Sequence, residues 1–68
     1  MAVTWDAKAV AMHNLALVHT RCDEVREAIE DSGIHTMPYG TAYIIHIAAT
    51  RKLMDYLHGL GYVVEVDV

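Results

Sequence analysis

The chain has 68 residues, of which 54% are hydrophobic, and its net charge is −4. That hydrophobic content excludes intrinsic disorder, and five Lys and Arg against nine Asp and Glu give no basic footprint for nucleic acid. We expect a single domain, residues 1–68, with a thin stability margin, because a chain this short buries only about 60% of its unfolded surface.

Targeting and membrane signals are missing from the sequence. The N-terminal stretch "MAVTWDAK" lacks the basic start and apolar run of a secretory signal. The longest apolar stretch, "AYIIHIAA", is far shorter than the roughly 20 residues that span a bilayer. Cys22 is the only cysteine, so no intrachain disulfide can form. We therefore expect a cytoplasmic protein with a reduced thiol and no membrane partner.

The first half of the chain has a helical pattern. No Gly or Pro occurs between Trp5 and Ser32, and Gly33 suits the left-handed position after a last turn. Apolar residues alternate at spacings of four and three, which is typical of a heptad seam. We predict one long helix over Trp5–Ser32. Its seam, the predicted oligomer interface, consists of Ala11, Leu15, Val18, Cys22, Val25 and Ile29.

The second half has shorter patterns. Pro38 and Gly40 break the chain within Gly33–Thr41, which predicts a loop. The β-branched and aromatic residues of Thr41–Ala48 predict a strand. On that strand Tyr43 and Ile45 share one face, which we expect to pack on the long helix, while His46 lies on the other, which we expect to be covered by the second helix or another subunit.

A helix and a strand complete the pattern. Thr50 is a suitable cap for a helix over Arg51–Leu60, with Gly61 at its end. Tyr62–Val68 alternates apolar and polar residues, which predicts a second strand with Tyr62, Val64, Val66 and Val68 inward. A strand–helix–strand order favours parallel strands with a right-handed crossover, although an antiparallel arrangement or pairing with another chain is an alternative.

The predicted fold is a small α/β or α+β domain in the order α-β-α-β, with a short sheet completed by self-association. A helix of 28 residues is about 42 Å long, whereas a compact domain of this size is roughly 28 Å across. Two strands alone also form a marginal sheet. Both mismatches favour a homodimer or a higher oligomer. The acidic stretch "DEVREAIED" and the basic Arg51 and Lys52 suggest further pairing, between either base and Glu27, Glu30 or Asp31.

Catalytic signatures are missing, so we expect no enzyme and no cofactor. The four Gly form no phosphate loop, and no Ser elbow or paired-carboxylate pattern occurs. On a helix, His19, Cys22 and Asp23 would share one face, which leaves a metal site as an alternative. A small buried thiol in an apolar seam is the common case for Cys22, and strong zinc signatures repeat paired ligands, which this chain does not.

A candidate binding region lies in the loop and the strand that follows it. Conspicuous side chains on loops often serve function, and Tyr and Met suit contact surfaces. His46 has two interpretations, a hydrogen-bonded and partly buried histidine or a polar group lining a functional surface. The candidate binding residues are His35, Met37, Tyr39, Tyr43 and His46.

The sequence thus favours a small, non-enzymatic, homo-oligomeric binding protein. Our first hypothesis is a protein-interaction module that regulates or inhibits a larger partner, as small acidic phage-encoded inhibitors do. The alternatives are a small-ligand binder with its pocket between subunits, built from the Tyr39–Tyr43 region and His46, and a metal-binding protein that uses His and Cys.

Overall fold

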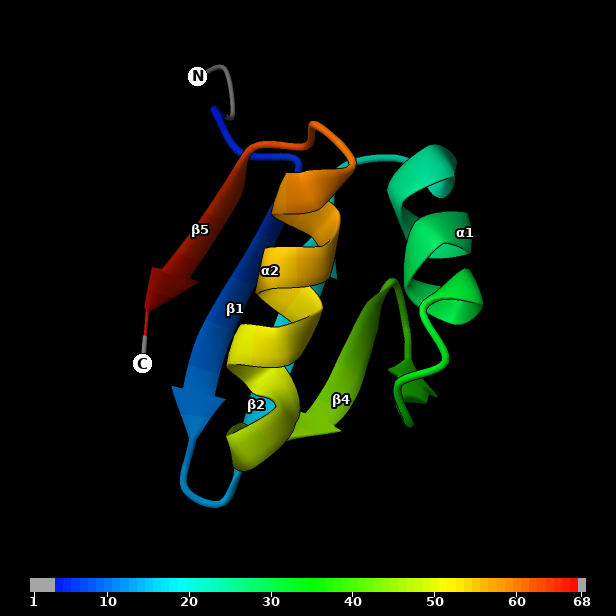
Figure 1. Cartoon of the computed structure of the whole chain (residues 1–68). Coiled ribbons are helices and arrows are strands. Elements are labelled where there is room, and N and C mark those ends of the chain that lie inside the picture. Colours follow the sequence, from blue (N-terminus) through cyan, green and yellow to red (C-terminus); the bar gives the residue numbers. More distant parts are fainter. Residues whose placement is uncertain (1–3, 68) are drawn as a thin grey trace.

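The computed structural model describes residues 4–67, which fold into a mixed α+β structure with one sheet (Figure 1). The strand order is β3-β4-β2-β1-β5, and every neighbouring pair is antiparallel except β1 and β5, which are parallel. The elements are β1 (Ala7–Met12), β2 (Leu15–Thr20), α1 (Asp23–Asp31), β3 (Met37–Tyr39), β4 (Ala42–His46), the 3-10 helix η1 (Ile47–Ala49), α2 (Thr50–Gly59) and β5 (Val64–Asp67).

The long N-terminal helix that we predicted is wrong. Half of the predicted span forms a hairpin, in which β1 pairs with β2 through a two-residue loop at His13 and Asn14. His13 has φ 59, the left-handed region that lets a tight loop reverse the chain. Within the predicted span only α1 is helical, and this helix of nine residues is about 13 Å long. The helix length and the two-stranded sheet therefore no longer argue for self-association.

The predicted heptad seam does not exist, because its six residues lie on three elements and point in different directions. Ala11 is exposed on β1, Leu15 is exposed on β2, and Cys22 is exposed just before α1. Val18 on β2 and Val25 and Ile29 on α1 are fully buried in the core. Two of the heptad positions thus pack α1 against the sheet of its own chain.

The second half of the chain agrees better with the prediction. A strand at β4, a helix at α2 and a strand at β5 are confirmed within one or two residues at each end; Val68 lies outside the described residues. The predicted loop before β4 contains the short strand β3, which we missed. β4 and β5 are parallel as expected, but β2 and β1 lie between them. The sheet is therefore complete without a second chain.

Both helices pack on one face of the sheet, the covered face (Figure 1). Strand residues on this face include the small Ala7, Ala9 and Ala16, all fully buried. Small side chains there make room for the larger apolar residues that the helices contribute. Those helical core residues are Val25, Ile29, Leu53, Met54 and Leu57. As predicted, Tyr43 and Ile45 lie on the face that packs against helix, and both are buried.

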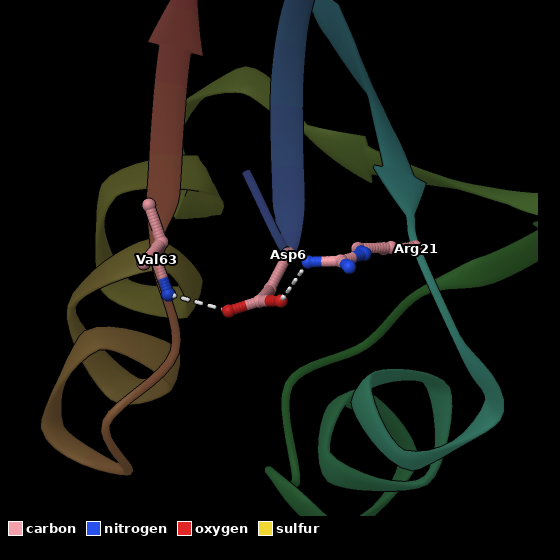
Figure 2. A network of polar contacts seen from close by, with 3 residues as sticks. All are labelled: Asp6, Arg21 and Val63. Atoms are coloured by element: carbon pink, nitrogen blue, oxygen red, sulfur yellow. Dashed lines mark hydrogen bonds and ion pairs between the residues drawn. The ribbon is translucent and has the colours of Figure 1, made fainter. Parts of the chain in front are cut away.

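Polar contacts hold the rim of this core. The Asp6 carboxylate accepts a hydrogen bond of 2.9 Å from the Val63 N–H and lies 3.6 Å from the Arg21 guanidinium, so it joins the start of β1 to β5 and to the end of β2 (Figure 2). The Tyr43 hydroxyl donates to Glu30 at 2.8 Å. We predicted that Arg51 or Lys52 would pair with acidic residues of the long N-terminal helix. The ion pairs within residues 4–67 are instead Arg21–Asp6 and Lys8–Glu65.

Candidate functional site: the open sheet face

The second face of the sheet has no helix packed on it among the described elements, and we call it the open face. Side chains directly opposite each other on paired strands point to the same side, so the register defines three rows. The first row is Tyr39, Ala42, His19, Lys8 and Glu65. The second is Met37, Ile44, Leu17, Val10 and Asp67. The third is His46, Leu15 and Met12. The second and third rows are thus apolar over β3, β4, β2 and β1 apart from His46, while the first row contains His19 and Lys8, and β5 contributes Glu65 and Asp67.

Large apolar side chains on the open face are exposed to solvent. Met37 is 59% exposed, Tyr39 63% and Leu15 44%. Two hollows flank the centre and share Leu15 and Ile44 in their walls. One, of about 230 Å³, extends toward Met12 and Tyr39. The other, of about 330 Å³, extends toward His35, Met37 and His46. A contiguous apolar surface with hollows of this kind is typical of an interaction site.

The structure brings together four of the five predicted binding residues. Met37 and Tyr39 project from β3 onto the open face, and His35 and His46 line the hollow beside Met37. Tyr43 does not join them, because its side chain points to the covered face, where it lies under the Arg26 guanidinium at 5.5 Å from the ring centre. Burial raises the pKa of Tyr43, and the neighbouring Glu30 raises it further.

His46 combines features of both of our interpretations. Its Nδ1 accepts a hydrogen bond of 3.1 Å from the Ala48 N–H, which caps η1, so the imidazole is hydrogen-bonded as the first interpretation held. The side chain is exposed at the margin of the open face, however, and is not partly buried. We had expected the apolar residues around it to be covered by helix 2 or another subunit. Helix α2 lies on the opposite face.

The geometry behind the metal alternative is wrong. His19 lies on β2, Cys22 precedes α1 and Asp23 begins it, so these three side chains do not share a helical face. Within residues 4–67 no three His, Cys, Asp or Glu side chains gather as ligands. Cys22 is also exposed, in contrast to the buried seam thiol we predicted.

Sequence reasoning missed a second feature, a groove of about 460 Å³ between α2 and β5. Met54 and Ile47 contribute apolar walls beside Val64 and Val66 of β5, while the rim from α2 is polar. The polar rim residues are Thr50, Arg51, Asp55 and His58. The helical spacing of the α2 residues was visible in the sequence. Their position beside β5 was not, because it depends on α2 connecting β4 to β5 across β2 and β1.

The large apolar open-face residues that we had named neither as binding nor as interface residues are Val10, Met12, Leu17 and Ile44. For the residues on β1 and β2, the available signal was the alternation in Lys8–Met12 and Leu15–His19. The positions that point away from the covered face in these stretches include apolar residues too. None of the helices within residues 4–67 is long and apolar enough to cross a membrane. Comparison of the chain with protein-family models, with curated proteins and with solved structures finds no match.

Proposed function

We propose that this protein is a non-enzymatic binding module that pairs with a second copy of itself through the open face and uses its remaining surface to regulate or inhibit a larger protein. The observation that carries the proposal is the continuous apolar area over β1, β2, β4 and β3, on which no described element packs. An uncovered apolar face of this kind is costly to expose and is characteristic of an association surface.

A second copy is a suitable occupant because two apolar sheet faces pack about 10 Å apart with interdigitating side chains. The four strands give roughly 300 Å² of flat area, from a spacing of about 4.8 Å and five residues at about 3.3 Å each. Stable interfaces bury about 800 Å² per partner. Side-chain relief enlarges the flat area, but the open face still belongs with the smaller interfaces. We therefore expect a weak dimer that responds to protein concentration.

A small-ligand binder is the second candidate, and the two hollows of the open face favour it. A second copy packed on the open face would cover both hollows, which share Leu15 and Ile44 in their walls. The hollow of about 330 Å³ alone reaches the range of small-molecule pockets, which begins at about 300 Å³, and the hollow of about 230 Å³ adds to it. Apolar walls from Leu15, Ile44 and Met37 would select an apolar ligand.

Light scattering coupled to size exclusion tests the dimer. The mass should rise from the chain mass of 7.6 kDa toward twice that value as the loaded concentration increases. A mass of 7.6 kDa at every concentration contradicts self-association. Native mass spectrometry of the same sample separates the two candidates, because a ligand enclosed between two copies would appear as added mass on the dimer and not on the monomer.

A further inference from the structure

The two edges of the sheet differ in their capacity to accept another strand. The β3 edge is three residues long and contains Pro38, which has no N–H to donate. Short edge strands and proline are common ways in which proteins block edge pairing. At the other edge, β5 has four residues without Gly or Pro and pairs on one side with β1. The β5 edge is thus the one open to strand addition.

The hydrogen bonds of β5 show which of its backbone groups point outward. The Ala7 N–H donates to the Val63 carbonyl at 3.2 Å, and Ala7 is the register partner of Val64. In a parallel ladder this places the N–H and C=O of Glu65 toward β1. Those of Val64 and Val66 therefore point away from the sheet, where they can bond to an added strand.

The groove between α2 and β5 lies beside these outward groups. Val64 and Val66 point to the covered face and form one wall of the groove, opposite α2. Alternate side chains of a strand added at this edge would fall into the groove over Met54. The intervening side chains would project on the open-face side, next to Glu65 and Asp67. The edge supplies main-chain hydrogen bonds and the groove supplies side-chain contacts, the combination used when proteins bind extended peptides.

The charges of β5 indicate the chemistry of the occupant. Antiparallel pairing of β5 with β5 of a second copy would place Glu65 and Asp67 against the same acids, and like charges opposite each other destabilise a sheet. A strand with basic residues at those positions would be attracted instead. The chain as a whole is also acidic, with a net charge of −4, which favours a basic partner.

We propose that the β5 edge and the adjoining groove bind an extended segment of another protein, added antiparallel to β5, in which apolar residues facing the groove alternate with Lys or Arg facing Glu65 and Asp67. The inference rests on the proposed binding function and specifies the partner. The antiparallel direction follows from its greater stability per residue.

A titration of the ¹⁵N-labelled protein with the capped peptide Ac-KVKVKV-NH₂ tests this proposal. The amide signals of Val64–Asp67 should shift, together with those of residues lining the groove. The matched peptide Ac-EVEVEV-NH₂ should bind about tenfold more weakly or less, because it places acids against Glu65 and Asp67. Equal binding of the two peptides, or shifts confined to the open face, would overturn the proposal.

N-methylated peptides test the register. In the proposed pairing the valines lie opposite Val64 and Val66, so their N–H groups face β5 and those of the lysines face away. Methylation of the valine nitrogens should weaken binding about tenfold or more through the loss of these hydrogen bonds, whereas methylation of the lysine nitrogens should leave most of the affinity. The same loss from both peptides contradicts the proposed strand pairing.

The protein itself offers a matched pair of variants. Val66→Pro removes an N–H that points away from β1, so the sheet of the chain loses no hydrogen bond while the added strand loses one. Val66→Thr keeps the N–H and should bind the peptide. If Val66→Pro fails to fold, the methylated peptides still decide the question on the wild-type protein.

The experiment separates this inference from the proposed dimer. The groove lies on the covered side of the sheet and the dimer surface lies on the open face. Peptide shifts at β5 in a protein that scatters as a monomer would retain the inference and refute the dimer. A concentration-dependent dimer whose β5 amide signals do not shift with any peptide would retain the dimer and refute the inference.

Discussion

The two faces of this sheet differ in the size of their apolar residues. The covered face has small side chains on its central strands, with Ala7, Ala9 and Ala16 beneath helices that contribute Leu and Ile. The open face has long side chains such as Met37 and Tyr39, and they are largely exposed. Small residues permit close approach by a helix of the same chain, while flexible or amphipathic ones suit an outside surface. At Ala7, Ala9 and Ala16 residue size thus distinguishes the covered face from the open face, whereas on β4 the covered Tyr43 and Ile45 are large.

The largest expected effect comes from a charge placed under the covered face. Val25→Asp should unfold the protein, because Val25 is fully buried in α1 against the sheet. An unpaired buried charge costs several kcal/mol, and a domain of this length has about 3–10 kcal/mol in total. Far-ultraviolet circular dichroism at room temperature measures the loss of structure. A folded Val25→Asp variant would show that α1 does not pack as described.

The same charge on the open face should separate association from folding. Leu15→Asp should keep the native circular dichroism spectrum and remove the dimer, because Leu15 is 44% exposed and lines both hollows of the proposed interface. Leu60→Asp is the matched control, since Leu60 is 53% exposed at the end of α2. Sedimentation equilibrium should detect dissociation in Leu15→Asp alone. Equal association of both variants would remove the open face as the interface.

Next in size is the polar contact that joins β5 to the sheet. Asp6→Ala should lower the free energy of unfolding by about 1–2 kcal/mol, because it removes the hydrogen bond that Val63 donates to a carboxylate. Arg21→Ala should cost less than about 0.5 kcal/mol, since an exposed ion pair contributes little. Urea denaturation measures both values. The interpretation fails if Arg21→Ala is the more damaging change.

A hydrogen bond of the covered side adds a pH dependence. Tyr43→Phe should cost about 1–2 kcal/mol at neutral pH through loss of the bond to Glu30. The pKa of Tyr43 is raised in the folded state, so its contribution is fully present below the unfolded pKa of about 10 and is lost as pH rises through the folded pKa. The difference between wild type and variant should therefore shrink above about pH 10. Urea denaturation at neutral and alkaline pH measures it; a constant difference contradicts the assignment.

The smallest expected effect is a gain in stability. Cys22 holds the N-cap position of α1 with φ −151 and ψ 169, and its side chain makes no capping hydrogen bond. Ser at an N-cap accepts a bond from the first turn, so Cys22→Ser should raise the free energy of unfolding by about 0.5–1 kcal/mol. Peptide binding and dimer mass should stay unchanged. A large loss of either in a folded Cys22→Ser variant would revive a functional role for the thiol.

The second half of the chain was predictable because its signals are local. Thr50 and Gly61 bound α2, and alternation defines β4 and β5. β3 was missed because three residues containing Pro38 carry no strand pattern. The parallel direction of β4 and β5 followed from the helix between them. The position of β2 and β1 between those strands depends on pairing between distant parts of the chain, which no local sequence pattern shows.

The first half was predicted wrongly because both faces of its hairpin are apolar. Successive residues of Lys8–Met12 and Leu15–His19 point to opposite faces of the sheet, but apolar residues occur on both faces. The polar–apolar alternation that identifies a strand is therefore not visible in the sequence. Ala in the inward positions also has high helix propensity. The turn at His13 and Asn14 lacks the Asn-Gly or Asp-Gly pair that usually marks a hairpin. Of the residues that we predicted as a binding site, Met37 and Tyr39 lie on β3 and face the open side of the sheet, whereas the β5 edge was not among our candidates.

The central claim is that the open face is covered by a second copy while the other face is covered by helices of the same chain. Relaxation of methyl protons by a soluble gadolinium chelate measures this directly, on Leu15 and Ile44 of the open face and on Leu53 and Leu57 of the core. The open-face methyls should relax strongly well below the association midpoint and become protected well above it, with the core methyls protected throughout. Equal, strong relaxation of the Leu15 and Ile44 methyls at both concentrations would contradict the claim.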